Sequence, residues 1–471
     1  MDCGTTSPVT RLRGAETAAM PCRFKPYPAY KDSGVEWLGE IPTHWEVRPL
    51  KYCCGMNSET LNEETSPDYE LRYVDISNVD STGNVLGTEE LRFENAPSRA
   101  RRKVRSGDTI ISTVRTYLKA IAYLNDPPDN LIVSTGFAVL RPHSGLHPPF
   151  LWRIVQSEQF VQAVQAYSEG VGYPAINPSQ LGRLVVWIPK VDEQRAIAAF
   201  LDRATQKIDA LVDKKERLIK LLQEKRAALI TQAVTKGLDP TVPMKDSGVE
   251  WLGKIPANWK INRNKVLFRE IDRRSLEGEE ELLTVSHITG VTKRSAKEVY
   301  MIEAESHEGY KLCERDDLVI NTMWAWMGAL GIAGEPGMVS PSYNVYRLKD
   351  GVLLPRYYDH LCRVPPHVSE LTRFSKGVWK SRLRLYPEEF FEIMTPIPST
   401  KEQQAIAELL GRETAKLDAL IAKVREGIEK LKEYRTALIS AAVTGKIDVR
   451  EECVASASAV SRHSGGSRNP E

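Results

Sequence analysis

The sequence predicts an α+β protein in which two duplicated domains alternate with two long helices, which pair as an antiparallel coiled coil in a pseudo-two-fold arrangement. Two repeats carry this prediction. The nine residues KDSGVEWLG stand at 31–39 and again at 245–253, and each copy is followed by Ile-Pro and a tryptophan. A second pair, 193–235 and 402–444, aligns without a gap and is identical at 23 of 43 positions. Self-similarity at so long a period indicates a duplicated domain rather than a solenoid.

Composition places the chain among globular proteins of the cytoplasm. Its 471 residues are 42% hydrophobic, which suits two to four domains, each with its own core. No window approaches 18 consecutive apolar residues and no secretory signal is evident, so we expect no membrane span and a cytoplasmic location. The seven cysteines form no CxxC pair, which favours a reducing compartment. The net charge of +2 means that any nucleic-acid surface depends on local charge.

The globular domains are predicted from short runs rich in Val, Ile, Thr and Tyr, which Gly, Pro, Asn and Asp interrupt. The two domains diverge, but a skeleton is shared: DTIISTVRTYLKAIAY at 108–123 parallels DLVINTMWAWMGALGIA at 317–333. Both tails are small and polar, which predicts disorder. The expected parts are a disordered extension (1–29), a first domain (30–190), a central helix (191–237), a second domain (244–398), a distal helix (399–447) and a disordered tail (448–471).

Apolar residues of both helices recur at steps of three and four, which is the pattern of a coiled-coil seam. Pairing with another protein is one explanation, but the duplication favours pairing of the two copies with each other. The predicted seam comprises Ile197, Leu201, Ile208, Leu211, Leu218, Leu222 and Leu229 in the first helix, and Ile406, Leu410, Leu417, Leu420, Val424, Leu431 and Leu438 in the second.

Two basic clusters are candidates for binding nucleic acid, because Lys and Arg neutralise phosphates. Solvated basic loops are the alternative explanation for both clusters. Arg115 and Asn177 are further candidates in the first domain. The first cluster holds Arg99, Arg101, Arg102, Lys103 and Arg105, and the second holds Arg373, Lys376, Lys380, Arg382 and Arg384, interleaved with Phe374, Trp379 and Tyr386.

Over residues 30–448 the chain closely resembles the specificity subunit of type I restriction–modification systems. The doubled KDSGVEWLG with its Ile-Pro and Trp, and the doubled helix that begins with Glu-Gln and ends in Ala-Val-Thr, carry the resemblance. It implies two target-recognition domains, each reading one half of a split, asymmetric sequence in double-stranded DNA. It further implies that the helices set the spacer between the half-sites and dock two methyltransferase subunits, through which the restriction (motor–nuclease) subunits join.

The same resemblance implies that this chain binds no cofactor, and that AdoMet, ATP and Mg²⁺ belong to the partner subunits. A free-standing bipartite DNA-binding regulator, without methyltransferase partners, is the alternative. A fused enzyme with a cryptic active site is a third class, but the motifs disfavour it. The sequence DPPD at 126–129 lacks the aromatic residue that stacks on a flipped base, and no P-loop or HExxH motif occurs. We therefore expect no catalytic residue and no metal ligand in this chain.

Overall fold

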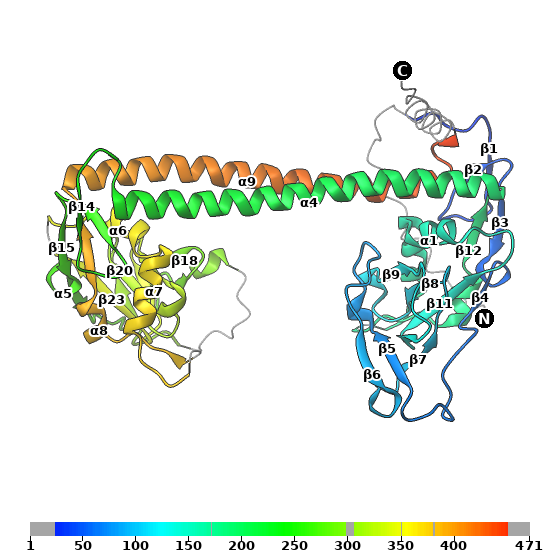
Figure 1. Ribbon diagram of the computed structural model, residues 1–471, viewed down its shortest axis with the longest axis horizontal. Helices are drawn as coiled ribbons and strands as arrows, with labels where there is room; N and C mark the ends of the chain where they lie inside the picture. The colour runs from blue at the N-terminus through cyan, green and yellow to red at the C-terminus, as the bar shows by residue number, and fades with distance from the viewer. Residues whose placement is uncertain (1–23, 171, 298–305, 350, 380–381, 451–471) are drawn as a thin grey trace, which may run out of the picture. The chain divides into compact units, whose positions relative to one another are not determined.

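The chain divides into two compact units. Unit 1 contains residues 1–214 and 426–471, and unit 2 contains residues 215–425. Two long helices, α4 (Val191–Lys236) and α9 (Thr400–Val443), each continue from one unit into the other (Figure 1). None of the helices in the described ranges has an apolar stretch of the length that a bilayer requires. The computed structural model describes residues 24–170, 172–297, 306–349, 351–379 and 382–450.

A four-stranded antiparallel sheet of the same order recurs in both units. In unit 1 the order is β4-β11-β8-β9, and in unit 2 it is β16-β23-β20-β21. Its central strands β8 (Thr109–Ser112) and β20 (Leu318–Asn321) are the Ile- and Val-rich runs that both sequence copies share, and every residue of both is buried. The duplication is therefore present in the structure as the same central sheet.

The sheets beside this framework differ between the units. Unit 1 adds a second four-stranded sheet, β6-β5-β10-β7, in which β5 and β10 are parallel, whereas unit 2 has the two-stranded sheets β17-β18 and β19-β22. Two smaller pairs recur, β1-β2 with β13-β14 and β3-β12 with β15-β24. The elements of unit 1 are β1 (Tyr30–Asp32), β2 (Glu40–Pro42), β3 (Glu46–Pro49), β4 (Cys54–Met56), β5 (Glu70–Val74), β6 (Glu89–Arg92), β7 (Ala100–Lys103), β8, β9 (Ile121–Tyr123), β10 (Leu131–Ser134), β11 (Phe137–Pro142), β12 (Val185–Ile188), α1 (Pro148–Gln156), α2 (Glu158–Ala166) and α3 (Pro178–Arg183).

The remaining elements of unit 2 follow the same course along the chain. They are β13 (Met244–Asp246), β14 (Lys254–Pro256), β15 (Lys260–Arg263), α5 (Asn264–Leu267), β16 (Phe268–Ile271), β17 (Leu283–Ser286), β18 (Gly290–Lys293), β19 (Lys311–Cys313), β20, β21 (Leu330–Ile332), β22 (Gly337–Val339), β23 (Tyr343–Leu348), α6 (Pro355–Leu361), α7 (Pro365–Phe374), α8 (Pro387–Glu392) and β24 (Met394–Ile397).

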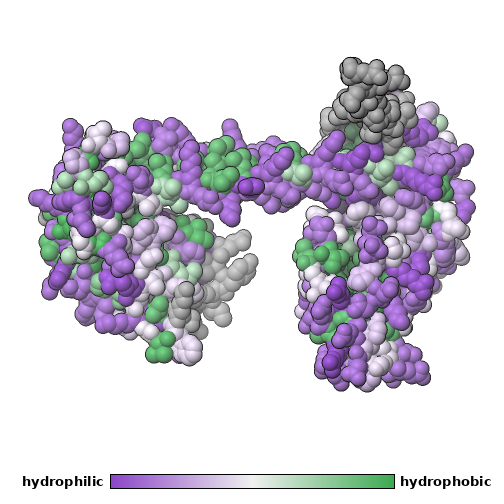
Figure 2. All heavy atoms as spheres, in the orientation of Figure 1, coloured by the Kyte–Doolittle hydropathy of each residue, from purple (hydrophilic) through white to green (hydrophobic). Residues whose placement is uncertain are grey.

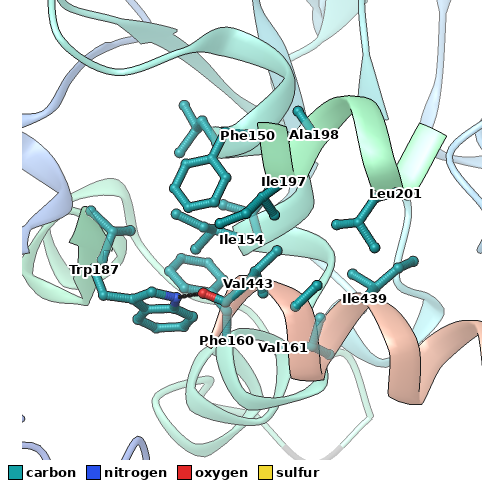
Figure 3. Packing of buried hydrophobic residues seen from close by; sticks show 14 of the residues in the cluster. Phe150, Ile154, Phe160, Val161, Trp187, Ile197, Ala198, Leu201, Ile439 and Val443 are labelled. Atoms are coloured by element: carbon teal, nitrogen blue, oxygen red, sulfur yellow. Dashed lines mark hydrogen bonds between the residues drawn. The ribbon is translucent and has the colours of Figure 1, made fainter. Parts of the chain in front are cut away.

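The largest core of unit 1 includes the ends of both long helices. Figure 3 shows Ile197 and Leu201 of α4 and Val443 of α9 packed with Phe150 of α1 and with Trp187. The Trp187 indole Nε1 donates a hydrogen bond to the carbonyl oxygen of Val443. The core of unit 2 is built in the same way, with Val234 of α4 and Ile406 of α9 packed against α6. Each globular domain is thus packed directly on an end of each helix.

The duplicated segment KDSGVEWLG and the tryptophan that follows it attach to the start of a long helix in each unit. Trp45 Nε1 donates to Glu193 Oε1 at 3.1 Å, and Trp259 Nε1 donates to Glu402 Oε2 at 3.0 Å. Glu193 and Glu402 are the first residues of the doubled helix repeat. The same donor and acceptor therefore join the two repeats in both units, which explains why both occur twice.

The glutamine beside each of these glutamates closes a nearby loop. Gln194 accepts a hydrogen bond from the His147 amide at 2.7 Å and donates to the carbonyls of Gly145 and Pro189. Gln403 accepts from the Leu354 amide, also at 2.7 Å, and donates to the carbonyls of Val352 and Pro398. Both glutamine side chains are fully buried, so the polar groups that each loop carries into the interior are paired.

The two helices run antiparallel inside each unit. In unit 1, Arg435 of α9 donates to Asp209 of α4 at 2.9 and 3.3 Å. In unit 2, Arg226 of α4 lies 3.1 Å from Asp418 of α9. Asp209 and Asp418 are equivalent in the helix repeat, as are Arg226 and Arg435. The two ion pairs therefore have the same register, while a continuous coiled coil along the whole helices stays a prediction.

Burial tests the predicted seam residue by residue. Three of its members are substantially exposed: Leu211 at 43%, Leu218 at 41% and Leu420 at 44%. The seam assignment is wrong at these positions. Leu229, Leu417 and Leu431 are half-buried. The buried members are Ile197, Leu201, Ile208, Leu222, Ile406, Leu410, Val424 and Leu438.

The predicted disordered ends extend too far into the chain. Tyr27 and Val449 are buried, and the Asp448 amide donates to the carbonyl of Lys25 at 2.8 Å. The guanidinium of Arg450 also lies 4.9 Å from the ring centroid of Tyr27. Residues 24–29 and 448–450 thus belong to unit 1. The rest of both predicted tails lies outside the described residues.

A buried aspartate pairs with an arginine at the same point of each central sheet. Asp108 is completely buried and accepts from Arg141 Nε at 2.8 Å and Nη2 at 2.7 Å. In unit 2, Asp317 is 1% exposed and accepts from Arg347 at 2.8 and 2.9 Å. The hydrogen bond to Asp108 raises the pKa of the Arg141 guanidinium. Each pair joins the start of one central strand to the end of its neighbour.

Candidate nucleic-acid interface

The first basic cluster is partly neutralised by acidic residues that lie far from it in sequence. Arg99 bonds to Asp75 at 2.7 Å and to the Tyr73 hydroxyl at 3.2 Å, and Arg105 bonds to Glu59 at 2.6 Å. Glu59 also accepts from Arg141, and this hydrogen bond is the main cause that lowers the pKa of its carboxyl. Arg99 and Arg105 therefore offer less charge to DNA than their sequence context suggests.

The rest of this cluster lies on β7, where each side chain is half-buried. The guanidinium of Arg101 lies 4.7 Å from the ring centroid of Phe93. Desolvation lowers the pKa of Arg102, whose Nε has no hydrogen-bond partner among the described residues. No ion pair joins Arg101, Arg102 or Lys103 to a carboxylate in the part of the chain that the structure describes. These three stay candidates for phosphate contacts.

In the second basic cluster, too, some residues are paired with carboxylates and others are exposed. Arg373 donates twice to Glu370, at 2.7 and 2.6 Å, and Lys376 forms an ion pair with Glu389. Arg382 and Arg384 are exposed, and Arg384 pairs with Lys376 through the backbone. Lys380 lies outside the described residues. Arg382 and Arg384 thus remain the candidates in this cluster.

A turn and a hairpin that face one another form a small structure in unit 1, which we call the tip. It comprises residues 112–120, 168–170 and 172–176. Within the turn, the Leu118 amide donates to the Arg115 carbonyl at 2.9 Å, and the Ser112 amide donates to Ala120. The Ile176 amide joins the hairpin to Thr113 at 2.9 Å.

Unit 2 has a tip with three equivalent hydrogen bonds, formed by residues 321–329, 375–379 and 382–385. The Met327 amide donates to the Trp324 carbonyl at 3.0 Å, the Asn321 amide to Ala329 at 3.0 Å, and the Leu385 amide to Thr322 at 3.1 Å. This correspondence makes Arg115 equivalent to Trp324, and Tyr117 equivalent to Trp326. Three backbone hydrogen bonds of the tip are therefore duplicated, while its side chains are not.

Large aromatic side chains are exposed at both tips. In unit 1, Tyr117 is 52% and Tyr173 is 64% exposed. In unit 2, Trp324 is 50% and Trp379 is 68% exposed, and the Trp324 ring stacks on Trp326 with centroids 6.2 Å apart. Soluble proteins usually place such rings where a ligand or partner covers them. Aromatic rings beside arginines are typical of surfaces that contact nucleic acid.

Sequence reasoning named Arg115 and Trp379 but missed the other tip aromatics. The sequence could have identified them, because 112–120 and 321–329 align without a gap inside the shared skeleton. This alignment pairs Tyr117 with Trp326 and Arg115 with Trp324. Asn177, the other candidate of the first domain, has a structural role. Its side chain accepts from the Gln180 amide at 2.8 Å and caps α3.

The comparisons with known proteins agree on one family. Residues 59–220 match the family described as type I restriction modification DNA specificity domain, a range that contains the tip of unit 1. The chain is 24% identical over 441 residues to a putative type I restriction enzyme MjaX specificity subunit of Methanocaldococcus jannaschii, covering 88% of this chain and 96% of that protein. It is 25% identical to the HindI specificity subunit of Haemophilus influenzae, over 27% of this chain and 30% of that one.

Solved structures show the same fold along most of the chain. A structure described under the assembly and conformational transition of the type I R-M system matches with a TM-score of 0.67 at 23% identity, covering 86% of this chain and 99% of that one. The HsdS subunit from Thermoanaerobacter tengcongensis matches with a TM-score of 0.50 at 20% identity, covering 86% and 98%. Family model, relatives and fold agree: the chain is similar, over most of its length, to the specificity subunits of type I restriction–modification systems.

Proposed function

We propose that this specificity subunit reads an asymmetric, split DNA site, with one half-site bound by the tip of each unit. The observation that carries the proposal is the duplicated tip, in which three equivalent backbone hydrogen bonds recur in both units while the exposed side chains differ. A shared backbone supports a shared task, and different side chains support different target bases. Arg101, Arg102 and Lys103 of β7, and Arg382 and Arg384 of the unit 2 tip, supply phosphate contacts.

Catalysis belongs to other subunits in this proposal. The chain directs two methyltransferase subunits to the site, and the restriction subunits join through them. AdoMet, ATP and Mg²⁺ are bound by those partners. The alternative, a regulator without such partners, has no support from the relatives to which the chain is similar.

Apolar side chains on the surface of the long helices support docking of the methyltransferase. In unit 2, Leu218 and Leu221 of α4 are 41% and 53% exposed, and Leu420 of α9 is 44% exposed. Figure 2 shows apolar side chains interrupting the otherwise hydrophilic surface of the helices. Leucines at such positions stabilise a helical protein when a partner covers them.

The first prediction concerns the DNA target. Co-expression of the chain with the methyltransferase subunit of its own system should produce methylation at one split motif whose two halves differ, because the two tips carry different side chains. Methylome sequencing measures this directly. A chain with Arg115→Ala and Trp324→Ala together is the matched variant and should methylate a motif that is relaxed in both halves. A palindromic or continuous motif in the first sample would contradict the proposal.

The second prediction concerns stoichiometry. Since the helix repeat occurs twice, one chain should bind two methyltransferase subunits. Native mass spectrometry of the purified complex gives the count. The variant Leu218→Glu/Leu221→Glu should lose one of the two methyltransferase subunits without losing its own fold, because the equivalent residues of α9 are Gly427 and Lys430. Glu216→Lys on the same helix tests for a general effect of charge. Saturation at one methyltransferase per chain would refute the stoichiometry.

A further inference from the structure

Arg115, like Arg101, Arg102 and Lys103, meets no carboxylate among the described residues, and unlike those three half-buried side chains it is exposed. Arg99, Arg105 and Arg141 are all held by acidic partners. Arg115 is exposed at the edge of the tip. Its guanidinium lies 4.6 Å from the ring centroid of Tyr173, a residue of the facing hairpin. The side chain is thus oriented by an aromatic ring rather than neutralised by an acid.

The backbone of Arg115 is also unusual. Its φ is 52°, in the left-handed region that residues with a Cβ atom rarely adopt. The amide of Arg115 donates to the Pro174 carbonyl at 2.8 Å, which ties this conformation to the hairpin. Lys119, at the other end of the turn, has the same φ, and its equivalent in unit 2 is Gly328. Strain of this kind is characteristic of functional sites, where the surrounding structure enforces it.

The equivalent residue of unit 2 keeps the position and changes the chemistry. Trp324 has a φ of −123°, is half exposed and stacks on Trp326. An arginine presents a planar fork of donors, whereas a tryptophan presents an apolar face. The same point of a duplicated backbone therefore carries two side chains that recognise different groups.

We propose that this position determines base specificity in each half-site, and that Arg115 reads a guanine through its O6 and N7 atoms in the major groove. A guanidinium that stacks on a ring keeps its outer edge available, and paired donation to guanine is its most common specific contact with DNA. Trp324 would instead make apolar contact with a base of the other half-site, such as the methyl group of thymine. This inference rests on the proposed function, because it names the residues through which that function is specific.

The test uses the complex of the chain with its methyltransferase subunits and a DNA library in which both half-sites are randomised. Binding selection should show that Arg115→Ala relaxes one guanine position of one half-site, with discrimination there falling about 5- to 150-fold, the range typical of a lost paired contact. Affinity for non-specific DNA should change less than about twofold. Arg115→Lys should retain only part of the discrimination, because an amine lacks the planar fork.

Two matched variants separate specificity from charge and from folding. Arg92→Ala removes an exposed arginine from β6 of the same unit and should leave both half-sites unchanged. Trp324→Ala should relax the other half-site alone. If Arg115→Ala weakens binding equally for all sequences, or leaves the guanine preference intact, the assignment of Arg115 is overturned. If the unaltered complex selects no split site at all, the proposed function itself fails, so the two failures are distinguishable.

Discussion

Replacing Asp108 with alanine is expected to destabilise unit 1 by about 3 kcal/mol, the lower end of the usual effect of removing one partner from a buried ion pair, because the Arg141 side chain is 25% exposed. Asp108 is fully buried and accepts two hydrogen bonds from Arg141, as well as one from the Arg105 amide at 2.8 Å. Without this carboxylate, the Arg141 guanidinium keeps only Glu59 as an acidic partner. The strands β8 and β11 would lose the ion pair that connects their ends.

Hydrogen exchange measured peptide by peptide is the suitable readout, because a protein of two units need not unfold in a single transition. Asp108→Ala should speed exchange in β8 and β11 and spare unit 2. Asp317→Ala is the matched variant and should speed exchange in β20 and β23 while sparing unit 1.

Asp209→Ala is the control at an exposed ion pair. It removes a half-exposed partner and should cost less than about 1 kcal/mol. The additional change Arg141→Met should recover part of the stability, because it removes a largely buried charge that has lost its buried partner. A loss near that of Asp209→Ala would show that the buried pair is not what secures the sheet.

Most of the fold was predictable from the sequence because the chain was duplicated. Two divergent copies that keep the same residues reveal which positions the fold requires. The matched Asp108 and Asp317 are the clearest case, since the sequence alone aligned them and both prove to be buried. The paired tryptophans and glutamates of the two repeats are another.

The basic clusters were less predictable, for an electrostatic reason. Whether an arginine is available depends on which acidic residues the fold brings to it. Asp75 reaches Arg99 across 24 residues of sequence, and Glu59 reaches Arg105 across 46. Those contacts pass through the sheet β6-β5-β10-β7, whose pairing cannot be read from local sequence. Arg115 is the candidate that the structure strengthens. Its guanidinium packs on the ring of Tyr173, and a pattern of charges in the sequence cannot identify that contact.

The seam was partly wrong because a heptad pattern was applied to long helices. An α-helix has 3.6 residues per turn, so its buried stripe drifts by about 20° per heptad against a strict 3.5-residue repeat. At α9 the buried stripe includes Ile421 and Ile428 in place of Leu420. On α4 it passes through Ile230 and Val234. The leucines that leave the stripe become the exposed apolar residues of the helices.

Lengthening both helices by one heptad is expected to lengthen the DNA spacer and to leave both half-sites unchanged. Both connections of the chain between the units lie inside helices, at Lys214–Lys215 in α4 and at Arg425–Glu426 in α9. Seven added residues extend each helix by about 10.5 Å, which corresponds to about three base pairs at 3.4 Å each. Seven residues are close to two helical turns, so the residues beyond the insertion keep their orientation toward the partner helix.

The ion pairs make these insertion points preferable to the end of α4. Insertions after Lys214 and Arg425 leave Asp209–Arg435 on one side and Arg226–Asp418 on the other, so both bridges keep their register. An insertion after Lys236 would instead disturb its hydrogen bonds to the carbonyls of Leu252 and Lys254.

Methylome sequencing of the doubly extended chain should show the original half-sites with about three more base pairs between them. A heptad in α4 alone cannot keep both bridges in register, so this variant should lose methylation rather than shift the spacer. If the doubly extended chain is folded and reads the original spacer, or reads altered bases, then helix length does not set the spacing between half-sites.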